Sequence, residues 1–335
     1  MRSPIGIVGF RGYSGAELVR LLDHHPHAEP VLLEHRQDSP ADPQPLSAKP
    51  TRRIPATAEA VQAEKLALVF LATPPDVSME LAPALLKTGA KVIDLSGAFR
   101  LWDIAAYSRW YKEKHTAPEV FAESRYGLPE FCRDVIPNAR LIANPGCYPT
   151  AANLAIRPLV EAGVIDRACG IVCDAKSGVS GAGRKPSLKT SFCEVTENFT
   201  AYSVLDHRHV AEILMVSGIQ EAELSFTAHL LPIHRGILET IYFRARGLSS
   251  VEELLNIYVR RYEKEPFVRL YPAGTLPDIH GVERTNFCDI GVRFDAASGR
   301  AVVVSVIDNL VKGAAGQAVQ NMNLALGFEE TDGLL

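Results

Sequence analysis

Several features are missing from this chain of 335 residues, and each absence excludes a class of protein. No apolar run reaches the length that crosses a bilayer, so we expect no membrane-spanning segment. No Lys/Arg-rich run occurs and the net charge is −4, which gives no support to nucleic-acid binding. The N-terminus enters a strand-like segment directly and carries no signal-peptide pattern. We therefore expect a cytoplasmic protein that binds neither membranes nor nucleic acids.

The six cysteines also lack the spacing of a metal site. They contain no CxxC pair, and Cys169 and Cys173 have no second pair or nearby His cluster that would complete a zinc site. In a chain of this size without a secretion signal, reduced thiols are the default. The sequence therefore predicts no bound metal, and it contains no internal repeat and no low-complexity tract.

The first part of the chain alternates short apolar strands with helices. Strands are predicted at 5–9, 31–35, 66–71, 91–95 and 140–143, with helices at about 16–22 and 76–87. A segment rich in proline and polar residues, 39–55, is expected to be a loop. The alternation predicts a parallel sheet covered on both faces, which is the Rossmann-type α/β architecture that binds nucleotides by default.

The pattern changes after about residue 165. Strands are predicted at 170–175, 226–231, 238–244, 287–292 and 301–306, and helices at 209–217 and 250–264. Several of these strands alternate polar and apolar residues, as an antiparallel sheet with one wet face does. The second half is therefore predicted to be an α+β domain with a mainly antiparallel sheet. The tail, 312–326, is predicted to be a helix that can pack back on the first domain.

A glycine-rich turn, GFRGYSG at residues 9–15, lies between the first predicted strand and the first helix. Positions without side chains let a pyrophosphate approach backbone N–H groups at a helix N-terminus. The spacing is G-x-x-G-x-x-G rather than G-x-G-x-x-G, but the flanking strand and helix supply the required context. The alternative is a turn that only connects the two elements. At the end of the second strand, Glu34 favours NAD and Arg36 favours NADP, so the type of dinucleotide stays open.

The strongest candidate for catalysis is Cys147, in the stretch NPGCYPT at residues 144–150 between a predicted strand and a predicted helix. A thiol at such a turn lies near unpaired backbone N–H groups and the positive end of the helix dipole. Both favour the thiolate, which is the form that a nucleophile needs at neutral pH. The alternative is a small buried hydrophobic residue, because free cysteine is often buried.

A thiolate that attacks an acyl group needs a partner for proton transfer and groups that bind the developing charge. The stretch DHRH at 206–209 precedes a predicted helix and offers two imidazoles and one guanidinium. The alternative is a cluster at a helix start held by Asp206 and Glu212. His234 and Arg235 form a second, weaker candidate.

Two further segments suit anions. The Gly/Ser-rich segment 176–185 has cations at both ends and can present N–H groups to an anion or a nicotinamide amide; the alternative is a flexible surface loop. Residues 96–100 follow the fourth strand, at the edge where open parallel sheets bind ligands, and Arg100 there can bind a phosphate.

Seven motifs occur in one order along nearly the whole chain: GxxGYSGxEL (9–18), DLSGAFR (94–100), YGLPE (126–130), NPGCYPT (144–150), SGVSGAGR (177–184), HRHxxE (207–212) and NLxKGAAGQA (309–318). Together they resemble the N-acetyl-γ-glutamyl-phosphate reductase family, which is related to aspartate-semialdehyde dehydrogenase. The glycine turn alone is a weak signal, whereas this ordered set is highly specific.

The resemblance implies NADP(H) as the cofactor of a Rossmann-type domain, 1–146 with 310–335, and a catalytic and dimerisation domain, 147–309. It implies Cys147 as the nucleophile and His207 as the acid–base residue. The substrate phosphate would be bound by Arg100 and a substrate carboxylate by Arg208, with Asn144 and Glu212 also at the substrate. The cofactor would be bound by Gly9, Gly12, Tyr13, Ser14, Gly15, Arg36, Ser96, Ser177, Gly178 and Asn309. The family often has small hydroxyl residues where Glu34 and His35 stand here, so an NADP preference depends mainly on Arg36.

We therefore expect reduction of N-acetyl-L-glutamyl 5-phosphate to the 5-semialdehyde, in arginine biosynthesis, by a homodimer or homotetramer. One alternative is a sister reductase that acts on aspartyl phosphate or on a carrier-bound aminoadipyl phosphate. Another is a non-catalytic NADP-binding sensor, against which the presence of both Cys147 and His207 argues.

Overall fold

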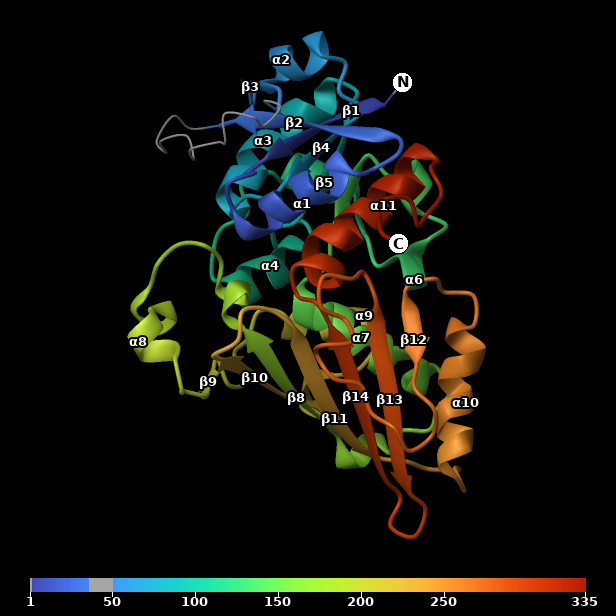
Figure 1. The fold of residues 1–335 in the computed structure, drawn as a ribbon. Helices are drawn as coiled ribbons and strands as arrows, with labels where there is room; N and C mark the ends of the chain where they lie inside the picture. Colours follow the sequence, from blue (N-terminus) through green and yellow to red (C-terminus); the bar gives the residue numbers. More distant parts are fainter. Residues whose placement is uncertain (1, 36–50) are drawn as a thin grey trace. The chain divides into compact units, whose positions relative to one another are not determined.

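The computed structural model describes residues 2–35 and 51–335 (Figure 1). The predicted cofactor ligand Arg36 and most of the predicted loop 39–55 lie outside these residues. The chain divides into two compact units. The first contains Met1–Tyr107, Glu113–Asn144 and Ala318–Leu335, and the second contains Ser108–Lys112 and Pro145–Gln317.

The first unit is built on a parallel sheet of seven strands in the order β3-β2-β1-β4-β5-β7-β6, which confirms the predicted Rossmann-type class. Its strands are β1 (Ser3–Val8), β2 (Ala28–Glu34), β3 (Arg53–Pro55), β4 (Leu68–Leu71), β5 (Lys91–Asp94), β6 (Ser124–Tyr126) and β7 (Leu141–Ala143). All of β4 is buried, as expected of a strand covered on both faces. The loop predicted over 39–55 was wrong at its end, because residues 53–55 pair with β2 as an edge strand despite their proline.

The helices of the first unit connect these strands. They are α1 (Tyr13–Asp23), α2 (Ala58–Ala63), α3 (Pro75–Lys87), α4 (Ile104–Tyr111), α5 (Pro118–Phe121) and α6 (Pro129–Cys132), with the 3-10 turn η1 (Ile136–Asn138). The predicted tail helix is two elements, a π-helical turn η6 (Val311–Ala315) and α11 (Gly316–Leu326). Within the first unit, Asn321 of α11 donates a hydrogen bond to the Gly127 carbonyl at 2.8 Å, so this part of the tail packs on the N-terminal domain.

The second unit contains a seven-stranded mixed sheet in the order β12-β13-β14-β11-β8-β10-β9 (Figure 1). Its strands are β8 (Ile171–Gly178), β9 (Thr200–Tyr202), β10 (Leu224–Leu231), β11 (Ile237–Arg244), β12 (Val268–Leu270), β13 (Cys288–Asp295) and β14 (Arg300–Ile307). Most neighbours are antiparallel, as predicted, but β8 pairs with β10, and β12 with β13, in parallel.

Helices cover one face of this sheet. They are α7 (Cys147–Glu161), α9 (Val210–Ser217) and α10 (Val251–Tyr262). The unit also contains the short segments α8 (Phe192–Val195), η2 (Arg167–Cys169), η3 (Val179–Ala182), η4 (Leu188–Thr190) and η5 (Glu221–Glu223). Ser305 of β14 donates to the Ala151 carbonyl of α7 at 2.9 Å, which fixes this helix against the sheet. Val172 and Tyr242 are exposed on the opposite face of the sheet. This is the solvent-exposed face that the alternation of polar and apolar residues predicted.

No helix among the described residues is both long and apolar enough to cross a bilayer. In the same part of the chain, no three His, Cys, Asp or Glu side chains are grouped so that they can hold a metal ion.

Candidate active site

Cys147 is the first residue of α7, and it is half-buried. The preceding residue, Gly146, caps the helix with an extended backbone, and its N–H donates to the Glu212 carboxylate at 2.9 Å. Glu212 is fully buried, so the structure shows it holding the turn that carries the thiol. The helix dipole and the first-turn N–H groups favour the thiolate at this position. The predicted position of Cys147, at the N-terminus of a helix, is therefore confirmed.

The π-helical turn η6 lies directly against Cys147. A Cβ built on Gly313 would lie 2.8 Å from the Cβ of Cys147. That distance is too short for any side chain, so the backbone of the π-helical turn forms the wall beside Cys147. The motif around Gly313 was recognised in the sequence, but its contact with Cys147 was not.

His207 lies in an aromatic cluster in the same unit. Its ring centroid is 5.4 Å from that of Tyr148, 5.4 Å from Phe226 and 4.9 Å from His209. Cys147 is the chain neighbour of Tyr148, so the predicted nucleophile and the predicted acid–base residue both lie next to this tyrosine. Burial, and then the Arg208 cation, lower the pKa of His207 to about 4. The imidazole is therefore neutral at pH 7.

Two tyrosines that sequence reasoning missed belong to the same cluster. The hydroxyls of Tyr148 and Tyr202 are 3.0 Å apart. Burial raises the pKa of both phenols, that of Tyr202 to about 12, and charge on Cys147 raises each pKa further. Their signal in the sequence is weak, because Tyr148 is one residue of a motif and Tyr202 lies on a separate short strand.

Arg208 is arranged differently from the histidines on either side. It is exposed, and its guanidinium lies 5.6 Å from the centre of the Tyr111 ring. His207 and His209 are both buried. The stretch that looked like one cluster in the sequence therefore separates into buried imidazoles and an exposed cation.

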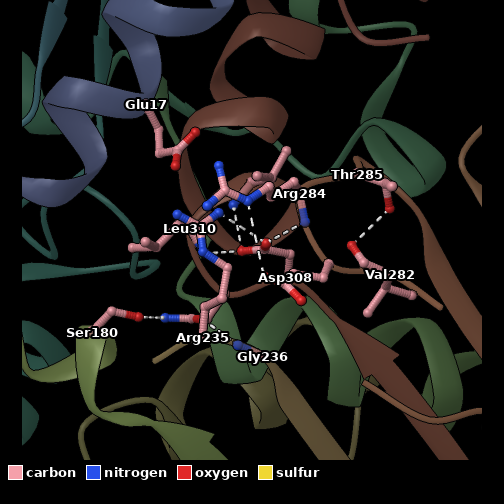
Figure 2. Close-up of polar contacts among 12 residues, drawn as sticks. Glu17, Ser180, Arg235, Gly236, Val282, Arg284, Thr285, Asp308 and Leu310 are labelled. Carbon is pink, nitrogen blue, oxygen red and sulfur yellow. Dashed lines mark hydrogen bonds and ion pairs between the residues drawn. The ribbon is translucent and has the colours of Figure 1, made fainter. Parts of the chain in front are cut away.

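The predicted cofactor residues of the second unit lie together around Gly181. A Cβ on Gly181 would lie 2.8 Å from Ser177 Oγ and 3.8 Å from Asn309 Nδ2. Asn309 donates to Ser180 Oγ at 2.9 Å and accepts the Gly236 N–H at 2.7 Å (Figure 2). The segment that was open to a flexible-loop interpretation is thus held by side-chain hydrogen bonds at Ser177–Ser180.

In the first unit the glycine turn follows β1, which lies where the strand order reverses. Ligands of open α/β sheets bind at this point. Gly9 has a φ of +79°, and a Cβ there would lie 2.2 Å from the Ala72 carbonyl oxygen. A Cβ on Gly15 would lie 2.3 Å from the Gly9 carbonyl oxygen. The turn is closed to side chains, and α1 begins directly after Gly12, with Tyr13 and Ser14 in its first turn. These features fit a dinucleotide pyrophosphate.

Glu34, at the end of β2, is flanked by two arginines that the sequence did not single out. Arg11 Nη2 lies 3.4 Å and Arg53 Nη1 3.6 Å from its carboxylate. The Phe10 ring lies under both guanidiniums, at 4.7 and 5.7 Å. The sequence signal for Arg53 is absent because its strand, β3, was not predicted.

Arg100, Ser96 and Asn144 lie at the carboxyl ends of β5 and β7, in the first unit. The buried Arg100 donates from Nε to the Asn144 carbonyl at 2.8 Å and from Nη2 to the Leu95 carbonyl at 2.7 Å. Ser96 Oγ donates to Asp94 at 2.7 Å, and burial raises the pKa of this aspartate. Three predicted site residues therefore meet at one edge of the sheet, as the rule for parallel strands requires.

Comparison with known proteins places this geometry in a family. Residues 4–139 match the model of the semialdehyde dehydrogenase NAD-binding domain, and residues 147–309 match that of the semialdehyde dehydrogenase dimerisation domain. The aspartate semialdehyde dehydrogenase II of Vibrio cholerae, solved with ASA, has a TM-score of 0.72 and 18% identity over 98% of this chain and 99% of its own. An NADP complex of the Candida albicans aspartate semialdehyde dehydrogenase has a TM-score of 0.71 and 17% identity over 97% and 98%.

Curated relatives are much closer in sequence. The N-acetyl-γ-glutamyl-phosphate reductase of Symbiobacterium thermophilum is 47% identical over 100% of this chain and 98% of its own length. That of Geobacter metallireducens is 46% identical over 98% and 97%. The chain belongs to the N-acetyl-γ-glutamyl-phosphate reductase family, on the semialdehyde dehydrogenase fold.

Proposed function

We propose that this chain reduces N-acetyl-L-glutamyl 5-phosphate to N-acetyl-L-glutamate 5-semialdehyde with NADPH, as a step of arginine biosynthesis. The observation that carries the proposal is the shared position of Cys147, at a helix N-terminus, and the buried His207, both beside Tyr148. A thiol and a neutral imidazole are the groups that thioester chemistry requires. The relatives at 45–47% identity supply the substrate.

The Cys147 thiolate attacks the acyl carbon, the bond to phosphate breaks, and a thioester and inorganic phosphate form. First-turn N–H groups of α7 stabilise the oxyanion. When bound, NADPH supplies the hydride that reduces the thioester carbonyl. His207 exchanges the proton at the hemithioacetal oxygen through Nε2, and breaking of the C–S bond then releases the aldehyde and restores the Cys147 thiolate.

The cofactor is assigned to the glycine turn of the first unit, with Ser96, and to Ser177, Gly178 and Asn309 of the second. The proposed domains are 1–146 with 310–335, which contains the glycine turn, and 147–309, which contains Cys147 and His207. NADP is favoured over NAD because Arg11 and Arg53 give the surroundings of Glu34 an excess of positive charge. Arg36, outside the described residues, would add to that charge.

For the substrate, we assign its phosphate to Arg100 and its carboxylate to Arg208, with Asn144 and Glu212 shaping the site. Arg208 suits the carboxylate because it is exposed beside the buried His207. We also propose that the active form is a homodimer or homotetramer in the cytoplasm; the match to a dimerisation domain supports association.

The reverse reaction tests the function. Phosphate-dependent NADP+ reduction is measured with N-acetylglutamate semialdehyde and, in parallel, with aspartate semialdehyde and an aminoadipate semialdehyde bound to its carrier protein. Turnover that favours the N-acetylglutamate compound supports the proposal. A preference for either of the others would identify a sister reductase, and no turnover with any of them would identify a sensor.

A further inference from the structure

A buried ion pair at the end of β14 is used by none of the steps above. The guanidinium of Arg235 lies 3.1 Å from the Asp308 carboxylate, and both side chains are at most 5% exposed. The same carboxylate accepts the backbone N–H groups of Arg284, Leu310 and Val311, at 2.7, 2.8 and 3.2 Å (Figure 2). Burying two charges costs free energy that their attraction often fails to recover, so such a pair is a poor source of stability alone. It does, however, fix geometry.

On one side, Asp308 fixes the π-helical turn. Its carboxylate binds the N–H groups that enter η6, and its carbonyl accepts the Gly313 N–H at 2.9 Å. Gly313 is the residue whose missing side chain leaves room for Cys147. π-helical turns are rare and occur frequently at functional sites. The position of the wall beside the thiol therefore depends on Asp308.

On the other side, the pair fixes the Ser177–Ser180 segment. Asn309, next to Asp308, bridges Ser180 and Gly236, and the Gly178 N–H donates to the Gly236 carbonyl at 3.0 Å. A Cβ on Gly178 would lie 2.8 Å from the backbone nitrogen of Arg235. Displacement of the Arg235 backbone would consequently move this segment.

We propose that Arg235 and Asp308 are positioning residues, which hold the Gly313 turn against Cys147 and so restrict the thiol to its attacking orientation. The inference rests on the proposed role of Cys147 as nucleophile. It also assigns the Arg235 cation to Asp308, where the sequence had left it as a second ligand candidate.

The test compares Arg235→Met, Arg235→Lys and Gly313→Ala in the full-length protein. Turnover is measured together with the rate at which iodoacetamide alkylates each cysteine, followed by peptide mass spectrometry. In Arg235→Met we expect kcat to fall about 100-fold, the loss that a misplacement of about 1 Å causes, with little change in KM. Alkylation of Cys147 becomes several-fold faster, because a displaced wall uncovers the thiol. Arg235→Lys restores part of kcat, since a lysine can still pair with Asp308.

The chain supplies its own folding controls. Cys173 and Cys288 are fully buried and must stay protected, which separates a displaced wall from general unfolding. Arg269→Met removes another ion pair of the same unit, with the buried Asp289 at 2.7 Å, and should change neither kcat nor Cys147 alkylation.

Gly313→Ala keeps the ion pair and adds a methyl group against Cys147, so kcat falls and alkylation of Cys147 slows. It tests the packing of the turn against Cys147. If Arg235→Met does not fold, Arg235→Lys decides the role of the ion pair, because it weakens the pair without removing the positive charge, and kcat should then lie below that of the wild type. Unchanged Cys147 alkylation and kcat in the folded variants would overturn the inference. The alkylation measurement needs no substrate, so it stands even if the proposed reaction fails its own test.

Discussion

The backbone N–H of His209 donates a hydrogen bond to Nδ1 of His207 at 3.2 Å. Because that nitrogen must accept, the proton of the neutral ring is on Nε2. This bond gives different surroundings to two histidines that only the family resemblance, and not the local pattern, distinguished. His207 is the ring whose outer nitrogen can exchange a proton, and the backbone of His209 orients it.

The first prediction concerns the titration of His207. Burial and the Arg208 cation lower its pKa to about 4, so the imidazole stays neutral as the pH falls through 6 and becomes charged only near 4. Arg208→Met removes one of the two causes and should raise the pKa toward the usual 6.5. NMR titration of the ring protons, with His207→Gln to assign the signal, measures both. A wild-type midpoint near 6.5 would contradict the buried, neutral ring.

The second prediction concerns Cys147. Cys147→Ser should lower kcat by about 10³-fold or more, since loss of a nucleophile removes most of the catalysis that depends on it. It should also abolish the rapid release of phosphate that accompanies thioester formation, measured in a stopped-flow phosphate assay. Cys169→Ser, at an exposed thiol, is the matched control and should retain normal turnover. Near-normal activity of Cys147→Ser would exclude a covalent mechanism.

The third prediction concerns the charges around Glu34. Removing one guanidinium, in Arg11→Met or Arg53→Met, should weaken binding of 2′,5′-ADP about tenfold, the equivalent of one charged hydrogen bond of about 1.5 kcal/mol. Glu34→Gln should strengthen it, because the carboxylate repels the phosphate. Calorimetry with 5′-AMP, which lacks the 2′-phosphate, provides the control and should show little change. Equal losses for both ligands would place the arginines elsewhere on the nucleotide.

The fourth prediction concerns Glu239, a fully buried carboxyl that Cys173 contacts at 3.5 Å. Burial raises its pKa well above 4.5. The folded protein therefore keeps Glu239 protonated at a pH where the unfolded chain has already lost the proton. Its contribution to the free energy of unfolding declines as the pH rises above about 4.5, the pKa of an unperturbed glutamate.

Glu239→Gln should remove this dependence and stabilise the protein at pH 7 by about 1–3 kcal/mol, the scale of an unfavourable buried polar group. At pH 4 the two proteins should differ little. Urea unfolding at both pH values measures the difference, and Glu263→Gln, at an exposed residue, is the control. Equal stabilities at pH 7 would show that the buried carboxyl is not the cause.

Local pattern in the sequence determined much of this protein. Apolar runs and their flanking glycines and prolines predicted five of the seven strands in each sheet, the glycine turn after β1 and the helix that begins at Cys147. These features depend on residues close together in the chain, so periodicity and turn chemistry are sufficient to find them. The three-residue strands β6, β9 and β12 were missed. The edge strand β3 was missed because it has three residues, contains a proline and exists only by pairing with β2.

Only the tertiary structure decided which charges and backbones meet. Asp308 pairs with Arg235, which lies 73 residues away in the chain, and Gly313 of the turn η6 lies against Cys147 at the start of α7. Glu34 acquires its arginines from a turn before it and a strand after it. No local pattern encodes these partners, because they depend on the order in which strands join the two sheets. The same reason explains why the sequence could predict a role for Cys147 but not the contacts that surround it.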